Sequence, residues 1–392
     1  MALNFRILKN AFIAALAVEL GACEMVTEIQ IPNEPATPVL NAAINPDSAW
    51  SINLSWARNI LDSSSFTYIT NAAVTITDEG GSTVATLSYE HDGRYTSDGK
   101  PETGKTYTVI ADIPNFGKIT STARVPLVPK ISNGASRIVT FDNAPQGFFS
   151  IWVEDDAAEK NFYEISLMQI SEYQDGETQE LRRMFFPIYA QSDHPALTNI
   201  LPYESSFLIT DNLFSGKQIE LRLKTEAGTY PAGKSRGVAI CVRSVTEDYF
   251  NYVTTLKLQY KLDQDPLAQP LDVKTNIQGG LGFFGAFTQS AFMIMNPMPV
   301  ITSIQPTQGR SGDLVVINGE NLDSESAATY AYFISTTDGS FSPGGFGLVP
   351  TPVIESSPTR LVVVVPKQAK TNRIVIRAHG TYAFSDIFMI LD

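Results

Sequence analysis

The clearest β pattern in the chain is the stretch Pro299-Val300-Ile301-Thr302-Ser303-Ile304-Gln305-Pro306-Thr307-Gln308-Gly309-Arg310-Ser311-Gly312-Asp313-Leu314-Val315-Val316-Ile317-Asn318-Gly319-Glu320-Asn321-Leu322. Residues 300–304 and 314–317 are rich in β-branched side chains, which favour strands. Residues 306–312 lie between these runs and contain a proline and two glycines, a typical turn composition. Gly319 then suits a tight turn that requires a positive φ. This spacing predicts paired short strands, as in a β-sandwich.

The same pattern continues toward the end of the chain. Two more strand-like runs follow at residues 361–366 and 373–378, so we expect one sandwich domain over residues 297–392. The proline, the two turn glycines and the Gly-x-Asn-Leu ending of the quoted stretch resemble the IPT/TIG domain, an immunoglobulin-like module. The resemblance implies a structural and interaction role, with no chemistry of its own.

An insert at residues 336–350 is longer than this resemblance leads us to expect. It contains Phe341 and Phe346 among several glycines. Aromatic side chains on a surface loop are suited to anchoring a protein partner. Packing of the loop back onto its own sandwich is an equally good interpretation. Phe341 and Phe346 are therefore candidate partner-binding residues.

Strand-like runs also fill the first part of the chain. Residues 51–56 and 73–77 alternate apolar and polar side chains, and turn residues separate them from further runs of the same kind. Pro126 and Pro129 follow the last of these runs. We therefore predict an N-terminal immunoglobulin-like β-sandwich over residues 49–129.

Residues 130–296 are predicted to form a β-rich middle domain with one exception. Between residues 246 and 261, Tyr249, Tyr252 and Tyr260 belong to an apolar pattern with helical spacing. This pattern predicts one amphipathic helix whose tyrosine stripe packs in the core. The expected fold class is thus mainly β, with immunoglobulin-like sandwiches at both ends flanking a β-rich middle domain with one amphipathic helix.

The beginning of the chain has the features of a lipoprotein signal. Two basic residues precede an uncharged apolar run, and Leu20-Gly21-Ala22-Cys23 follows. This order is that of a secretory signal, and its end resembles the lipobox of bacterial lipoproteins, in which the cysteine is lipidated. A transmembrane anchor is the alternative, but the apolar run is too short to span a bilayer. We expect a signal peptide over residues 1–22, a lipid on Cys23 and a proline-rich tether over residues 23–48.

Several strings before residue 292 support a second resemblance. They are Cys23-Glu24, Val74-Thr75-Ile76-Thr77-Asp78, Gly93-Arg94-Tyr95, Gly104-Lys105-Thr106-Tyr107-Thr108-Val109 and Asn276-Ile277-Gln278-Gly279-Gly280-Leu281-Gly282-Phe283-Phe284-Gly285-Ala286. Together they resemble the DUF4249 lipoproteins of Bacteroidota. The resemblance implies an outer-membrane lipoprotein of unassigned activity, often encoded beside a TonB-dependent receptor, with no catalytic residue to carry over. Asp47-Ser48-Ala49 also resembles an O-glycan acceptor of that phylum, which makes Ser48 a candidate modification site.

Charge limits the classes of partner. The chain has 28 basic and 41 acidic residues and a net charge of −13. Nucleic-acid binding needs a basic footprint that releases counterions, so this class is disfavoured. The same balance opposes adhesion to anionic lipid, so membrane attachment is expected to come from the acyl chains on Cys23. Cys241 lies in an apolar run and is expected to be a small buried residue.

Motifs for catalysis are weak or missing in the sequence. Gly280-Leu281-Gly282-Phe283-Phe284-Gly285 matches G-x-G-x-x-G, but its aromatic surroundings favour a glycine-containing strand over the start of a nucleotide-binding helix. No zinc-type spacing of His or Cys residues occurs. Glu154-Asp155-Asp156 has the oxygen ligands that Ca²⁺ prefers, although a solvated turn is the favoured interpretation. We expect no catalytic residue, no metal and no cofactor besides the lipid.

These observations predict a non-enzymatic lipoprotein on the outer membrane, on its extracellular face. It would act by protein contacts as an accessory subunit that gates, caps or scaffolds an outer-membrane β-barrel. That barrel would be a TonB-dependent receptor or the barrel-assembly machinery, with other surface lipoproteins as further partners. The alternative is a glycan- or nutrient-binding lipoprotein in which Trp50, Trp56 and Trp152 stack on sugar rings. Exposed tryptophans would favour this alternative, and buried ones would count against it.

Overall fold

The fold is taken from a computed structural model. It describes residues 36–58, 67–141, 144–174, 181–192, 194–195, 197, 200–201, 203–229, 236–265, 267–269, 271–323, 329–336, 347–379 and 381–391. Contacts divide the chain into two units, and the first, residues 1–36 and 58–63, lies almost wholly outside these ranges. The predicted signal peptide and Cys23 are therefore outside the described residues. Among the described residues, no helix combines the length and apolar character that crossing a membrane would require.

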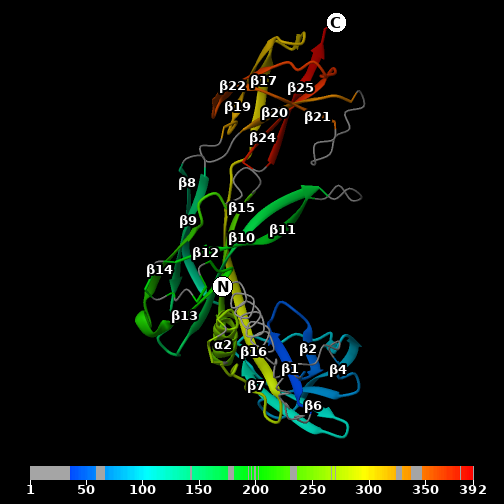
Figure 1. The fold of residues 1–392 in the computed structure, drawn as a ribbon, viewed down its shortest axis with the longest axis vertical. Coiled ribbons are helices and arrows are strands. Elements are labelled where there is room, and N and C mark those ends of the chain that lie inside the picture. The colour runs from blue at the N-terminus through cyan, green and yellow to red at the C-terminus, as the bar shows by residue number, and fades with distance from the viewer. Residues whose placement is uncertain are drawn as a thin grey trace, which may run out of the picture. The chain divides into compact units, whose positions relative to one another are not determined.

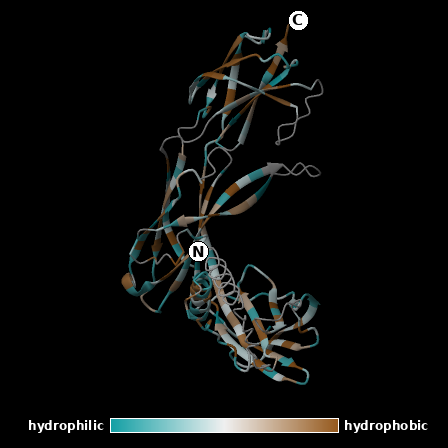
Figure 2. Ribbon diagram, in the orientation of Figure 1, coloured by the Kyte–Doolittle hydropathy of each residue, from teal (hydrophilic) through white to brown (hydrophobic). Residues whose placement is uncertain are grey.

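The expected mainly β architecture is confirmed. The described residues form four sheets and one α-helix, α2 (Glu247–Leu262) (Figure 1). Polar and apolar residues are interspersed along many of the strands (Figure 2). Along these strands, buried residues alternate with more exposed ones, as in sheets with one face in the core.

The largest sheet has the strand order β11-β10-β15-β16-β1-β2-β5-β4-β3-β6-β7, with β13 paired to β10. Its strands are β1 (Pro38–Ile44), β2 (Trp50–Trp56), β3 (Ala73–Asp78), β4 (Thr83–His91), β5 (Arg94–Ser97), β6 (Thr106–Ile113), β7 (Gly117–Arg124), β10 (Phe162–Gln174), β11 (Leu181–Ile188), β13 (Ser206–Thr210), β15 (Gly237–Val245) and β16 (Leu281–Met295). β7 and β11 are the last strands on the two sides of this path.

The predicted tether is wrong for residues 38–44, which form β1. This strand pairs in parallel with β16 and antiparallel with β2. Leu40, Ala42 and Ile44 are buried in one core with period two. Small alanines and nearby prolines give this segment the composition of a linker, so its role as a strand depends on the partners that flank it.

The predicted boundary at 129/130 does not separate two sheets. The first part of β16 pairs with β1, and the second part pairs with β15. Correspondingly, Phe284 and Ala286 lie in one hydrophobic core while Phe292 and Ile294 pack against the next. One long strand thus joins the two regions that the sequence divides into separate domains.

A second sheet packs against the β10–β15 region. Its order is β12-β14-β9-β8. Its strands are β8 (Lys130–Phe141), β9 (Ala144–Glu154), β12 (Ala190–Gln191) and β14 (Gln218–Thr225). Phe149 and Leu221 from this sheet share a core with Ile165 and Ile240. A short 3-10 helix, η1 (Asp211–Leu213), follows β13.

Helix α2 matches the predicted helix closely. The Thr246 side chain caps it by accepting a hydrogen bond of 3.3 Å from the Tyr249 amide. Tyr249 is buried, and the Tyr252 ring stacks on the Phe283 ring at 4.3 Å. The far end of the predicted tyrosine stripe differs, because Tyr260 is exposed instead of packed in the core.

The C-terminal residues form a two-sheet sandwich. One sheet has the order β17-β19-β23-β22, and the other has β18-β25-β24-β20-β21. The strands are β17 (Val300–Gln305), β18 (Gln308–Gly309), β19 (Leu314–Glu320), β20 (Tyr330–Ile334), β21 (Leu348–Thr351), β22 (Val353–Ser357), β23 (Arg360–Val364), β24 (Asn372–Ala378) and β25 (Thr381–Ile390). Their core includes Val315, Phe333 and Phe388. Gly319 is required here because a Cβ would overlap the Val300 carbonyl.

Candidate functional site

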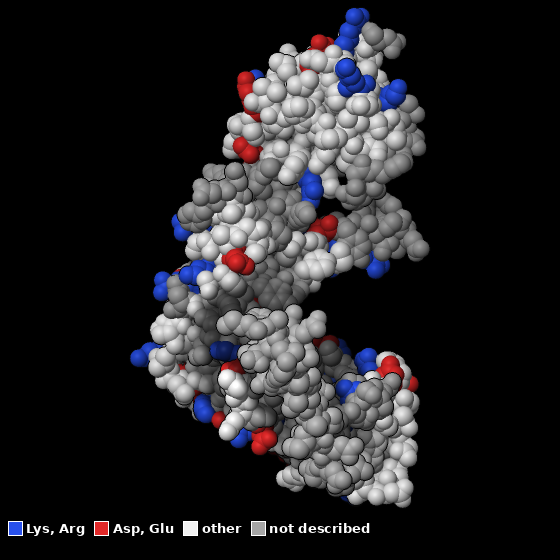
Figure 3. Space-filling model, viewed as in Figure 1, with Lys and Arg blue, Asp and Glu red and all other residues white. Residues whose placement is uncertain are grey.

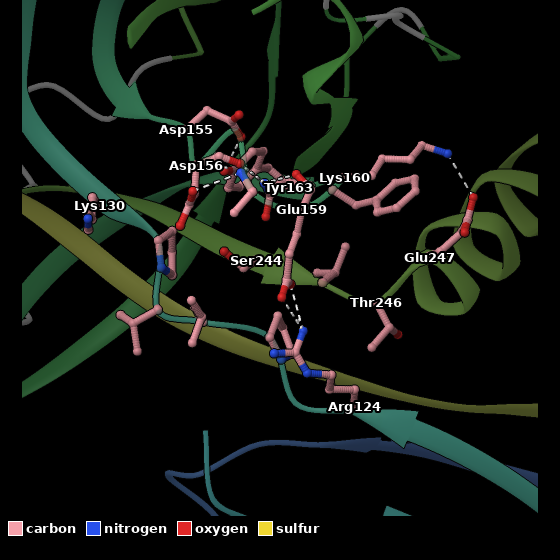
Figure 4. A pocket seen from close by; sticks show the side chains of 18 of the residues that line it. Arg124, Lys130, Asp155, Asp156, Glu159, Lys160, Tyr163, Ser244, Thr246 and Glu247 are labelled. Carbon is pink, nitrogen blue, oxygen red and sulfur yellow. Dashed lines mark hydrogen bonds and ion pairs between the residues drawn. The ribbon is translucent and has the colours of Figure 1, made fainter. Parts of the chain in front are cut away.

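A polar cleft of about 750 Å³ opens where three segments meet (Figure 4). They are the end of β7 with the chain that follows it, the turn after β9, and the junction of β15 with α2. Charged side chains line it: Arg124, Lys130, Glu154, Asp155, Asp156, Glu159, Lys160, Glu247 and Asp248. Six of these side chains are acidic and three are basic, so the lining is acidic on balance.

Two ion pairs join charged side chains of this cleft. Arg124 donates to both carboxylate oxygens of Glu159, at 2.7 and 2.6 Å. Lys160 donates to Glu247 at 2.9 Å and lies 4.7 Å from the centre of the Phe162 ring. These side chains are about half exposed, and such surface pairs contribute at most about 1 kcal/mol each. The pairs tie the three segments together.

The acidic string considered for calcium has a structural role at Asp155. The Tyr163 hydroxyl donates to Asp155 Oδ1 at 2.7 Å, and the Gly216 amide donates to Oδ2 at 2.8 Å. Burial, followed by this bond to a carboxylate, raises the pKa of Tyr163. Asp156 accepts from the Ala158 amide at 3.0 Å. Within the described ranges, no group of three or more His, Cys, Asp or Glu side chains is placed to hold a metal ion.

Three further ion pairs each contain a buried carboxylate. Glu164 accepts from Arg243 at 3.1 Å and from the Tyr249 hydroxyl at 2.9 Å. Burial, with the nearby Glu164 carboxylate next, raises the pKa of Tyr249. The other two pairs are Glu172 with Arg236, at 3.1 Å, and Glu204 with Lys257, at 2.7 Å. Sequence reasoning missed all three, since each joins residues more than fifty positions apart.

The tryptophans do not form an exposed stacking platform. Trp50 is buried, with its ring edge-on to Tyr107 at 5.0 Å. Trp56 is half-buried and packs edge-on against Phe116 at 5.9 Å. Trp152 is half-buried on β9. The structure does not bring the three indoles together in one cleft, and the burial of Trp50 counts against a glycan site built on these rings.

The remaining sequence candidates lie in different places. Ser48 is exposed in the turn between β1 and β2, so it is accessible, although it does not lie in a tether. Cys241 is half-buried on β15, and burial raises the pKa of its thiol. The G-x-G-x-x-G string lies in strand β16 and its approach rather than at the start of a helix. Phe341 and Phe346, like Cys23, lie outside the described residues.

A second candidate surface lies on β11. Met184, Phe185, Phe186 and Tyr189 are all exposed, Tyr189 by 60%, whereas Ile188 is buried. Met184 and Phe186 lie on one face of the strand and Phe185 on the other. Among the described strands, β11 is the last of its sheet, so this exposed apolar set, here called the β11 surface, borders an edge to which no described strand pairs.

The fold defines the class of the molecule first. It is a mainly β protein that ends in an immunoglobulin-like IPT/TIG domain, whose family model matches residues 299–388. The expectation drawn from the quoted C-terminal stretch is therefore confirmed.

The larger part of the chain belongs to the DUF4249 family. The family model, described as a domain of unknown function, matches residues 26–292. This single match covers both the region around β1–β7 and the region around β8–β16, in agreement with the strand that joins them.

Similar solved structures are distant. A γ-CGTase from alkalophilic Bacillus clarkii has 15% identity and a TM-score of 0.18, covering 66% of this chain and 26% of its own. A structure with a xylogluco-oligosaccharide has 13% identity and a TM-score of 0.22, covering 90% and 60%. SGBP-B from the Bacteroides ovatus mixed-linkage glucan utilization locus has 13% identity and a TM-score of 0.15, covering 92% and 64%. This chain thus spans less than two thirds of each, and no curated protein matches it.

Proposed function

We propose that this protein is a non-enzymatic lipoprotein, anchored through Cys23, that serves as an accessory subunit of an outer-membrane β-barrel complex. It gates, caps or scaffolds a TonB-dependent receptor or the barrel-assembly machinery through protein contacts. The observation that carries the proposal is Leu20-Gly21-Ala22-Cys23 after a basic and an apolar stretch. A lipid at this position would hold the chain at a membrane surface beside integral proteins.

The β11 surface supports a role in protein contact. Exposed apolar side chains at a strand edge are unfavourable in water unless a partner covers them. In the cleft, by contrast, Arg124, Lys160 and Asp155 are held by hydrogen bonds to neighbouring side chains. Glycan delivery by stacking tryptophans has less support, because Trp50 is buried.

Mild detergent extraction of the tagged native protein, followed by mass spectrometry of what co-purifies, tests this proposal. We expect a stoichiometric outer-membrane barrel in the eluate. A Phe185→Ser/Phe186→Ser variant should lose the barrel, while Phe116→Ser, an exposed aromatic outside β11, should keep it. Recovery of the protein without a barrel would contradict the accessory role, and an intact Cys23→Ser protein in the membrane fraction would contradict the lipid anchor.

A further inference from the structure

The outward face of the sheet β18-β25-β24-β20-β21 carries two aligned rows of side chains. Strand register places Tyr330, Arg377 and Tyr382 side by side in one row. The next row holds Tyr332, Val375 and Phe384. The inward positions between them, such as Phe333 and Ile376, belong to the domain core. We call these six outward residues the tyrosine–arginine face.

This face is more apolar than the solvent side of an antiparallel sheet usually is. Tyr330 is 48% exposed and Phe384 is 41% exposed. Val375 lies between Tyr332 and Phe384 in its row and is fully buried, although it belongs to the outward face. An incomplete second apolar layer of this kind gains further burial when a partner covers it.

The charge on this face is positive. Arg377 lies 5.7 Å from the centre of the Tyr382 ring, and its Nε is buried without a hydrogen-bond partner. Arg373 is exposed one row further along β24 and forms no ion pair with any described residue. None of the six face residues is acidic, and Asp386 at the β25 bulge is the carboxylate nearest in sequence. In a chain with net charge −13, two arginines among tyrosines are a local exception. On the face of the molecule drawn in Figure 3, basic and acidic side chains are interspersed.

Ring orientation bears on the kind of partner. The Tyr330 and Tyr332 rings stack on each other, with centres 6.4 Å apart and planes 24° apart. The two rings therefore turn flat faces toward each other, and the Tyr332 hydroxyl lies beside the Arg377 guanidinium. A sugar ring needs an open aromatic face, whereas carboxylates and peptide groups need hydroxyl and guanidinium donors. Tyrosine and arginine are also the residues enriched at the centre of protein interfaces.

We propose that the tyrosine–arginine face binds an acidic segment of a partner protein. The inference deepens the proposed function, on which it rests for the idea that this chain acts by protein contact. Carboxylates of the segment pair with Arg373 and Arg377, and its apolar atoms cover Phe384 and Tyr330.

Binding of fluorescent poly-L-glutamate to the chain from Glu24 onward tests this inference. We expect binding that weakens as salt is raised, because exposed charges are screened. An Arg373→Gln/Arg377→Gln variant should bind at least about tenfold more weakly, equivalent to about 1.4 kcal/mol. Arg360→Gln is the matched control, since Arg360 lies on the opposite sheet and pairs with Glu355. It should bind as the parent does.

Thermal unfolding of each variant shows whether weaker binding reflects loss of folding. If the double variant is unstable, the single Arg373→Gln variant, at an exposed position, replaces it and should also bind more weakly. Equal binding of polygalacturonate, an anionic polysaccharide, would overturn the choice of a polypeptide. Absence of binding, equal loss in Arg360→Gln, or self-association that the double variant abolishes would overturn the proposal. The poly-L-glutamate assay contains no barrel, so its result is independent of the co-purification experiment. Either experiment can fail while the other succeeds.

Discussion

Gly282 shows how a single residue allows the two parts of the main sheet to join. It lies on β16 opposite Leu40 of β1, with φ of +94°. A Cβ at this position would overlap the Leu40 carbonyl oxygen. Glycine is therefore required both by the backbone angle and by the close approach of the neighbouring strand.

We expect Gly282→Ala to destabilise the protein by about 3 kcal/mol or more, since overlap with backbone adds to the cost of a positive φ. Gly81→Ala is the matched control, with φ of +78° and no atom within 4 Å of the added Cβ. It should cost only about 1 kcal/mol. Urea unfolding of both variants measures the difference, and equal losses would contradict the close strand approach.

Tyr249 links a buried charge network to pH. Burial and the Glu164 carboxylate raise its pKa, so the folded state resists losing this proton. The contribution of protonated Tyr249 to the free energy of unfolding is fully present below about pH 10, the tyrosine pKa of the unfolded chain. It is lost as pH rises from there through the higher pKa of Tyr249 in the folded chain. The free energy of unfolding should therefore fall above about pH 10. Tyr249→Phe should make this decline shallower, and an unchanged slope in unfolding measured from pH 8 to 11 would contradict the assignment.

At the scale of elements, β1 is where local sequence and tertiary role disagree most. Residues 38–44 have the small and proline-flanked composition of a linker, but they form a central strand of the largest sheet. Helix α2 is the opposite case, because its capping threonine, acidic first turn and helical spacing are all local signals. Tyr260 belongs to the same local pattern but is exposed.

Leu40→Ala should cost about 2–5 kcal/mol, because Leu40 is fully buried in the first core. Val39→Ala, the adjacent half-buried position on the other face, should cost clearly less. The urea midpoints of the two variants measure this. An unchanged urea midpoint for Leu40→Ala would contradict the role of this segment as a buried strand and favour the tether interpretation.

At the scale of the whole molecule, β16 decides how many parts unfold together. The cores on its two halves are distinct clusters that share this one strand. The core of the IPT/TIG domain draws only on residues between Ile301 and Ile390. Pairing along a shared strand couples the first two cores, while the third is built from its own residues.

Calorimetry should therefore resolve two unfolding transitions rather than the three that a boundary at 129/130 would give. Gly282→Ala should lower the midpoint of the larger transition and leave the IPT/TIG transition in place, because their cores share no residue. Three separable transitions, or a Gly282→Ala shift confined to residues 37–125, would contradict coupling through β16. Limited proteolysis during heating identifies which residues unfold in each transition.

Features of the fold that depend on neighbours in the chain could be predicted from the sequence. The mainly β class, the helix near 246–261 and the C-terminal IPT/TIG domain follow from periodicity, caps and turn glycines within one short stretch each. For the site, the sequence located Ser48 in an exposed position, whereas Asp155 is half-buried and its carboxylate accepts hydrogen bonds from Tyr163 and Gly216 instead of lying in a solvated turn. Its predictions for Cys23, Phe341 and Phe346 concern residues outside the described ranges.

Strand pairing, ion pairs and burial that depend on residues distant in the sequence become visible only in the folded structure. Parallel pairing of β1 with β16 joins segments more than two hundred residues apart, and no periodicity in either segment specifies that partner. The Glu164–Arg243 pair, the exposure of Met184–Phe186 at a sheet edge, and the alignment of Tyr330 with Arg377 and Tyr382 are of the same kind. Strand register and burial are properties of the assembled sheet, because a side chain's surroundings are set by the strands and layers that come to lie beside it.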